Sequence, residues 1–571
     1  MLLATFQPDF ESVGGSLTAS ALVAAIPLVT LFVLLGGLRI TAWISGLAAL
    51  LVALIVATVA FSMPLDQAVL VGTWGAAFGF FPIMWIVINA IWVYNMTVET
   101  GHFDVLRRSF AAVSDDMRVQ AIIIAFCFGA LMEALAGFGT PVAITSVMLI
   151  ALGFRPMKAA TLALVANTAP VAFGALATPI VTLSAVTTGV DPSADASNFT
   201  ADHLGALVGH QTPVLALFVP LALVFIIDGK RGVRQTWVPA VVCGVAFAVA
   251  QWLTSTYFSV QLTDIVASLF SALAVVVLLR SWRPAESYTE PGEDDVSAPA
   301  RTRGAPVGGG TATVANTRPT TTTLPDPPAE VAKAYAPYLV IIVIFSIAQI
   351  TAIKDALANE PWTYLFQWPG LDLVTAGGDP PADFTFGWLS AAGTLTIIAG
   401  LITIPIIGIS PAMAVHAMGV TYRQLATAIV TVMAVLALAY VMNNSGQTGA
   451  LGNWLATTGS AFAILSPVLG WLGVAVTGSD TSSNSLFGAL QVTAAGKAGL
   501  DPALMAAANS SGGVLGKMIS PQNLAIAAAA VGMTGREGDI FRKVIGWSLL
   551  FLVGMCVLVF LQMTVLEWML P

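Results

Sequence analysis

Three ionisable residues lie within long apolar runs of this sequence, where charge is expensive. Glu133 stands in LMEALAGFG, Asp480 in TGSDTSSNS and Lys517 in GGVLGKMIS. An ionised side chain in the middle of a membrane costs roughly 2.5–3.5 kcal/mol on insertion scales and usually marks a functional site. A desolvated carboxyl group can bind and release a proton near neutral pH. Glu133 and Asp480 are therefore candidate proton carriers, and Lys517 is a candidate ligand for an anionic substrate. The structural alternative is that Lys517 forms an ion pair with Asp480 and only joins two helices.

Two apolar stretches, 119–153 and 454–496, are interrupted near their middles by AGFGTP and TGSDTSSNS. We predict that each is a re-entrant hairpin, whose non-helical tip must be satisfied by protein or water. Both tips contain Gly-x-x-Thr, with glycines at 137 and 478. Free N–H groups where a helix begins attract anions. The tips therefore supply four candidate substrate-binding residues, which are Gly139, Thr140, Thr481 and Ser482.

Each hairpin is followed by a copy of one pattern, NTAPVAFGALATP at 167–179 and NSSGGVLGKMISP at 509–521. Both copies place Asn, then Thr or Ser, then Gly seven residues after the Asn, and Pro twelve after it. We predict helix breaks at 167–170, where Pro170 removes a backbone donor, and at 509–513, where two glycines loosen the helix. The polar residues of the copies join the candidate substrate ligands: Asn167, Thr168, Asn509, Ser510 and Ser511. The alternative is that small polar residues only let helices pack closely.

These residues must be positioned by membrane-spanning helices, each of which needs about 20 apolar residues. The predicted fold is an all-α polytopic membrane protein with about twelve spans in addition to the two hairpins. The predicted spans are 20–38, 41–61, 74–97, 159–188, 205–228, 236–257, 264–280, 335–353, 385–409, 424–443, 500–532 and 544–568. The polar run 443–448 is either a hinge or site edge, or a helix cap.

The basic residues orient these spans. With both termini outside, 19 of the 22 Lys and Arg residues fall on the inner side. The exceptions are Lys354 and Lys497 on the outer side and Lys517 within the membrane. The first span lacks a basic leader and is expected to be retained. The Pro-, Thr- and acid-rich segment 281–334 is predicted to be a disordered cytoplasmic linker. It separates an N-terminal membrane half, 1–280, from a C-terminal half, 335–571.

Composition excludes several classes of protein. The chain has 571 residues, of which 57% are hydrophobic and only 9% charged, against about 25% charged in soluble domains. A soluble enzyme, a disulfide scaffold and a nucleic-acid binder are excluded. The scattered His and Cys residues show no metal-ligand spacing. The sequence has no Walker-type phosphate-binding loop, which argues against an ATP-driven pump. We expect no metal and no cofactor, and we find no nucleophile–base set that would make the chain an enzyme.

The two pattern copies run in opposite directions through the predicted topology, because span 159–188 leads outward and span 500–532 leads inward. Such an inverted-topology repeat is characteristic of secondary transporters, whose substrate lies near the midplane between the repeats.

The strings LMEALAGFGTPVAI, NTAPVAFGALATPI and MAAANSSGGVLGKMISPQNLAIA resemble the bacterial L-lactate permease family, and the layout of the chain agrees outside 281–334. The resemblance implies an inner-membrane symporter that imports L-lactate, and often D-lactate and glycolate, together with protons. Through a broader ion-transporter superfamily it also implies an elevator-type transport domain and, by analogy, a homodimer. Sodium-coupled dicarboxylate carriers of that superfamily have Ser-Asn-Thr at their hairpin tips. This sequence lacks an intact Ser-Asn-Thr there, which favours protons.

We therefore expect a proton-coupled importer of small 2-hydroxymonocarboxylates in the bacterial inner membrane. One alternative is a sodium-coupled carrier of small carboxylates. Another is an ion-translocating subunit of a respiratory complex, although such a subunit should spread its buried charges along the membrane rather than gather them at two hairpins.

Overall fold

The computed structural model describes residues 5–571 except 112, 115, 138, 191–193, 289–325, 376, 377, 379, 381 and 382. Most of the predicted linker therefore lies outside the described residues. The described chain is mostly helical, because long apolar runs satisfy their own backbone only as helices when no water is present. Exposed apolar side chains such as Leu22, Val59 and Val415 cover its outside, as expected for a surface that faces lipid.

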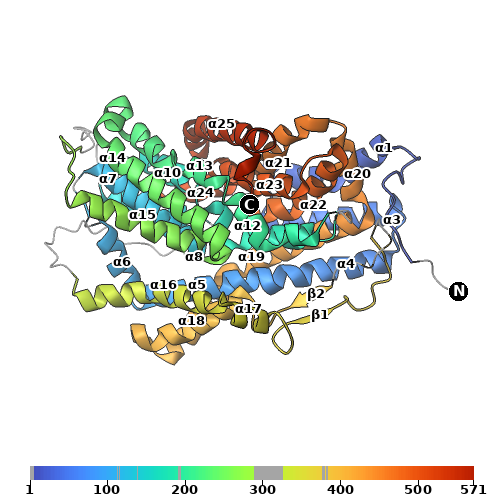
Figure 1. Cartoon of the computed structure of the whole chain (residues 1–571), viewed down its shortest axis with the longest axis horizontal. Coiled ribbons are helices and arrows are strands. Elements are labelled where there is room, and N and C mark those ends of the chain that lie inside the picture. Colours follow the sequence, from blue (N-terminus) through green and yellow to red (C-terminus); the bar gives the residue numbers. More distant parts are fainter. Residues whose placement is uncertain are drawn as a thin grey trace, which may run out of the picture.

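One group of helices is built around the long helix α19, Pro411–Ser445, which packs against α3, α4 and α5. In the same group α16 packs on α18, and α18 packs on α5. Figure 1 shows α16 and α18 along one edge of the molecule and α25 on the opposite edge. The other members have the following bounds: α1 Leu17–Ala24, α2 Ile26–Phe32, α3 Ala42–Val59, α4 Leu65–Phe78, α5 Trp85–Glu99, α16 Pro328–Ala348, α17 Thr351–Leu357 and α18 Ala392–Ile407.

A second group contains both predicted hairpins and both pattern copies. Its central contacts join α21 to α23, α14 to α15, and α22 to both α11 and α23. The helix α6, His102–Ala111, packs mainly on α16 and α5 of the first group. The helices of the second group are α7 Met117–Ala121, α8 Gly129–Ala136, α9 Thr140–Ala151, α10 Pro156–Ala166, α11 Gly174–Thr187, α12 Ala201–Val208, α13 Thr212–Ala216, α14 Val219–Tyr257, α15 Thr263–Leu279, α20 Gln447–Ala456, α21 Phe462–Thr477, α22 Asp480–Ala498, α23 Pro502–Gly516, α24 Pro521–Ala530 and α25 Glu537–Gln562.

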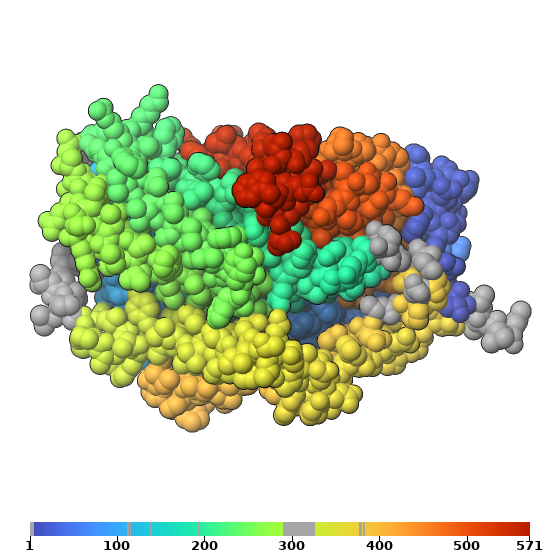
Figure 2. All heavy atoms as spheres, viewed as in Figure 1, coloured from blue at the N-terminus to red at the C-terminus, as the bar shows by residue number. Residues whose placement is uncertain are grey.

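Two short strands lie beside the first group. The strands β1, Tyr364–Phe366, and β2, Phe384–Phe386, pair antiparallel. Near them Phe6 forms a parallel bridge with Leu373, which ties the N-terminal segment to this loop. In the space-filling view, the chain from α16 to β2 and the green helices around α14 and α15 cover the same face of the molecule (Figure 2).

The described helices include ten that are long and apolar enough to span a membrane, or eleven if the bent pair α10 and α11 counts as one. The sequence predicts about twelve. The difference has local causes. The predicted span 385–409 forms the 16-residue helix α18, and 500–532 is divided between α23 and α24. The predicted spans 205–228 and 236–257 fall within one continuous candidate, Ala201–Tyr257. Conversely, the first arms of both hairpins, Met117–Ala136 and Gly459–Thr477, are themselves long enough to span.

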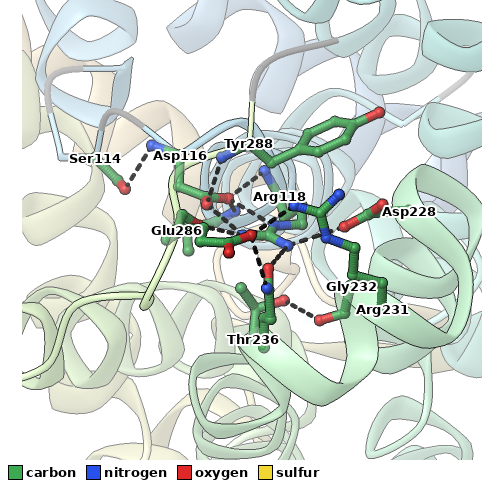
Figure 3. A network of polar contacts seen from close by, with 11 residues as sticks. Ser114, Asp116, Arg118, Asp228, Arg231, Gly232, Thr236, Glu286 and Tyr288 are labelled. Carbon is green, nitrogen blue, oxygen red and sulfur yellow. Dashed lines mark hydrogen bonds and ion pairs between the residues drawn. The ribbon is translucent and has the colours of Figure 1, made fainter. Parts of the chain in front are cut away.

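A buried arginine anchors the start of the first hairpin arm. The side chain of Arg118 is fully buried and forms ion pairs with Asp116 at 2.7 Å and Asp228 at 2.9 Å. It also donates to the carbonyl oxygen of Glu286 at 2.8 Å. These partners come from the start of α7, the kink of α14 and the segment that leads to residue 288, and Figure 3 shows them converging on one guanidinium. The network therefore ties the hairpin to α14 and to the segment that contains Glu286 and Tyr288.

Candidate functional site

The first predicted tip separates α8 from α9. The helix α8 ends at Ala136, and two glycines with positive φ follow, Gly137 at 23° and Gly139 at 84°. Only glycine adopts such angles without strain. A Cβ at Gly139 would also collide with Ile526 of α24. The break thus falls at the predicted tip, and it packs against the helix that follows the second pattern copy.

The second predicted tip separates α21 from α22 in the same way. Gly478, with φ of 76°, ends α21, and Ser479 caps α22 by accepting a hydrogen bond from the N–H of Ser482 at 3.3 Å. The first turn of α22 therefore begins at Asp480 and presents Thr481 and Ser482. Both predicted tips are thus places where a helix begins.

The first pattern copy breaks its helix where the sequence predicts. The helix α10 ends at Ala166, residues 167–170 are not helical, and α11 begins after a 66° bend. Three residues at the start of α11 have left-handed angles, Ala175, Leu176 and Ala177 with φ of 44°, 55° and 60°. Each such non-glycine residue costs roughly 1–2 kcal/mol, so tertiary contacts must hold this turn in place.

The prediction of a break at 509–513 in the second copy is wrong. The helix α23 continues from Pro502 to Gly516, and the interruption comes at Lys517–Ile519 and the extended residue Ser520. The glycines serve close packing instead. A Cβ at Gly512 would collide with the carbonyl oxygen of Pro467 on α21. The structure therefore supports the small-residue packing alternative at this position.

An ion pair joins the two hairpin systems. The Lys517 Nζ lies 2.5 Å from Oε1 of Glu133, and both side chains are buried. The Asn167 side-chain amide donates to the other oxygen, Oε2, at 2.9 Å. A Cβ at Gly174 would lie only 2.8 Å from Oε1. The break in the first copy thus brings Asn167 and Gly174 onto the carboxylate that faces Lys517.

The alternative that pairs Lys517 with Asp480 is wrong. The Asp480 Oδ2 instead accepts a hydrogen bond from the Ser510 hydroxyl at 2.6 Å, and Oδ1 has no partner among the described residues. The reason is geometric. Lys517 follows the end of α23 and reaches α8, whereas Asp480 meets α23 two turns earlier, at Ser510 and Gly513. Asp480 is therefore a buried carboxyl group without an ion-pair partner in the described part of the chain.

A hydrogen-bonded chain extends from Ser510. The Asn484 amide donates to the Ser510 hydroxyl at 3.2 Å and to the carbonyl oxygen of Pro179 at 3.1 Å. Asn509 donates to Asn484 at 2.9 Å and accepts from Gln491 at 3.0 Å. All of these side chains are buried. The chain links the second hairpin to both pattern copies.

A cavity of about 1240 Å³ opens beside these groups. Glu133, Asp480 and Lys517 line it, together with Thr481 and Ser482 of the second tip. It extends past Arg39 to Glu537, next to the basic residues that the topology predicts on the inner side. Its lining combines two basic residues (Arg39 and Lys517), three carboxyl groups (Glu133, Asp480 and Glu537) and hydroxyls, so the arrangement can bind a small anion and hold a proton.

The other predicted substrate ligands do not line this cavity. Asn167 and Asn509 are held in the hydrogen-bond networks above, and the hydroxyl of Thr168 donates to its own helix at Val165. The Ser511 hydroxyl is buried without a partner among the described residues. Gly139 and Thr140 of the first tip also lie outside the lining, where Gly137 takes part instead. Ser510 reaches the cavity only through Asp480.

A second cavity of about 670 Å³ lies further along α11. It is lined by Ser184 of α11, by Thr188, which follows that helix, and by Asn443, Asn444 and Thr448. The helix α19 ends at Ser445, and Gly446, with φ of 95°, joins it to α20. The polar run 443–448 is thus both a helix junction and the edge of a cavity.

Sequence reasoning missed Asn484, Gln491 and the cavity residue Gly174. Asn484 belongs to the polar string that marks the second tip and could have been chosen for that reason. Gln491 carries no such signal. Gly174 is the glycine of the first pattern copy, but its place beside Glu133 comes only from the packing of distant helices.

Comparison with known proteins adds a family match. A family model described as L-lactate permease matches residues 20–566. The L-lactate permease of Bacillus subtilis is 39% identical over 98% of this chain and 99% of its own length. The glycolate permease GlcA of Escherichia coli K12 is 41% identical over 97% of this chain and 98% of its own. Among solved structures, the YdaH transporter of Alcanivorax borkumensis matches 85% of each chain at 15% identity and a TM-score of 0.43.

Proposed function

Because this chain belongs to the L-lactate permease family, we propose that it imports L-lactate, D-lactate and glycolate by proton symport across the bacterial inner membrane. Relatives named for lactate and for glycolate resemble it about equally, which supports a substrate range of small 2-hydroxymonocarboxylates. The observation that carries the proposal is the ion pair of Lys517 and Glu133 on the wall of the larger cavity.

The pair explains how an anion and a proton travel together. The substrate carboxylate binds Lys517 and displaces Glu133 from it. An ionised Glu133 would then face the incoming anion in a desolvated site, with one cation shared between two carboxylates. Leaving a buried charge uncompensated costs about 3–5 kcal/mol. Glu133 therefore takes up a proton as the substrate binds, and the loaded site is neutral overall.

The second hairpin supplies the remaining contacts. The side chains of Asp480, Thr481 and Ser482 line the same cavity from the first turn of α22. In our proposal a protonated Asp480 donates from its unpartnered oxygen to the substrate hydroxyl. The N-terminal end of α22 attracts the partial negative charge of the substrate oxygens. Neutral Asp480 thus serves recognition, and Glu133 carries the transported proton.

Movement of the hairpins completes the proposal. We infer an elevator-type carrier with an inverted-topology repeat, in which the second helix group moves against the group around α19, within a homodimer. This proposal is supported by the correspondence between the two halves, since each has a hairpin tip followed by an interrupted helix. The larger cavity runs toward Arg39 and Glu537, so in the predicted orientation it faces the cytoplasm, and the smaller cavity faces outward.

Uptake of labelled L-lactate into proteoliposomes tests the function. An inward proton gradient should drive accumulation above the external concentration, whereas a sodium gradient alone should not. Accumulation driven equally well by sodium would overturn proton symport. Competition by D-lactate and glycolate tests the substrate range.

The role of Lys517 is tested by Lys517→Met, which should abolish saturable uptake. The matched control is Lys497→Met, since Lys497 is exposed at the end of α22. The single variant leaves Glu133 buried without its cation, which can itself cause misfolding. The double variant E133Q/K517M removes both charges, so a loss of uptake by the folded double variant reports lost binding. A folded double variant with normal substrate affinity would show that the pair is not the binding site.

A further inference from the structure

Another buried acid, Asp264, lines neither cavity. Asp264, in the first turn of α15, is 1% exposed. Its Oδ1 accepts a hydrogen bond from the Gln251 amide at 2.9 Å, and its Oδ2 has no partner among the described residues. No salt bridge to it is found within the described chain. An ionised carboxylate in this place would carry a large desolvation cost, so Asp264 holds a proton when the site is empty.

The surroundings of Asp264 contain one other acid. Five elements pack against α15, namely α8, α11, α14 and the short segments Ile122–Phe128 and Val260–Leu262. Their titratable side chains are Glu133, Cys127 and, on α14, Cys243 and the exposed Tyr257. The charged residues of α14 (Asp228, Lys230, Arg231 and Arg234) lie beyond its kink, at the other end of that helix.

Glu133 is carried by α8, which packs directly against α15. Burial without a counter-ion is the main reason why ionised Asp264 is costly. An ionised Glu133 on the neighbouring helix adds like-charge repulsion to that cost. When substrate displaces Glu133 and it becomes neutral, this repulsion disappears.

A hydrogen-bonded bridge joins Asp264 to the broken helix. The Gln251 amide that donates to Asp264 also donates to the carbonyl oxygen of Ala169 at 3.3 Å. Ala169 lies in the non-helical segment 167–170, two residues from Asn167, which donates to Glu133. Asp264 and Glu133 are thus connected by the packing of α15 on α8 and through the segment that positions the ion pair.

We propose that Asp264 is a second proton-binding site, which hands its proton to Glu133 when the substrate displaces that carboxylate and then reloads from the outer side. In this step the O–H bond of Asp264 breaks, an O–H bond forms on Glu133, and the vacated Asp264 carboxylate takes a new proton from water. This relay rests on the proposed proton symport.

The experiment compares two modes of transport by Asp264→Asn in proteoliposomes. Lactate counterflow needs no net proton movement, whereas accumulation driven by a gradient of one pH unit reaches about tenfold for an electroneutral 1:1 symporter. We expect D264N to keep counterflow and to lose accumulation, because the amide preserves the Gln251 contact but cannot release a proton. The control is Asp355→Asn, at an exposed position of α17.

Three outcomes are distinguishable. If the wild-type protein does not accumulate lactate with a pH gradient, the proposed symport itself fails. If the wild type and D264N both accumulate it, the relay is overturned and Asp264 only holds Gln251. If D264N loses both modes, Asp264→Glu decides, since it keeps an acid. Recovery of accumulation by D264E supports the relay, and recovery of counterflow alone overturns it.

Discussion

Replacing Glu133 by Gln should remove the pH dependence of substrate binding. Glu133 is the carboxylate that faces Lys517 at 2.5 Å, and in our proposal it takes up one proton for each lactate bound. Gln keeps the size of the side chain and can still accept a hydrogen bond from Lys517. The variant therefore removes the proton-binding group while it keeps the shape of the site.

The magnitude follows from linkage. If the empty site is unprotonated at Glu133 and the loaded site is protonated, binding takes up one proton, and the apparent Kd of the wild type rises about tenfold per pH unit. Between pH 6 and pH 8 this amounts to about a hundredfold, or roughly 2.7 kcal/mol. Loading without the proton would cost roughly 3–5 kcal/mol, or two to four powers of ten in affinity. In E133Q the slope should be near zero.

Binding can be measured by isothermal titration of the purified protein with L-lactate across this pH range, with Glu99→Gln as the control at an exposed position. Proton uptake on binding is read independently from the dependence of the heat on buffer ionisation. Lactate is an anion throughout the range, so its own ionisation does not contribute. If the apparent Kd of E133Q depends on pH as steeply as that of the wild type, Glu133 does not bind the transported proton. Asp480 would then be the candidate proton carrier, and Asp480→Asn should remove the pH dependence.

Three further substitutions test the geometry. Gly174→Ala would place a methyl group 2.8 Å from Oε1 of Glu133, so lactate uptake should fall at least tenfold while expression stays normal. Gly512→Ala should lower the free energy of unfolding by about 1–3 kcal/mol through overpacking against α21, measured by thermal unfolding in detergent. Gly546→Ala, which meets open space, should instead be neutral or stabilising. Arg118→Met would leave the carboxylates of its buried network unpaired and should cost about 3–5 kcal/mol; an unchanged melting temperature would contradict this.

The sequence by itself determined where the helices are interrupted at both tips and in the first pattern copy. Gly137, Pro170 and Gly478 act through their own backbone geometry, which no distant contact needs to supply. The apolar runs likewise indicated a polytopic membrane protein, because hydropathy and span length are properties of a continuous segment. The ordered strings at the hairpins and pattern copies pointed to the family that the whole chain matches.

The tertiary structure decided which partners these residues meet. Lys517 pairs with Glu133, 384 residues away in the sequence, rather than with the nearer Asp480. Gly512 could loosen a helix or admit a neighbour, and only the approach of α21 selects packing. The importance of Asp264 likewise depends on Gln251 and Glu133, which come from other helices. Helix formation follows from local hydrogen bonds and hydropathy, whereas ion pairs and close packing depend on which helix faces meet, and that is a property of the folded chain.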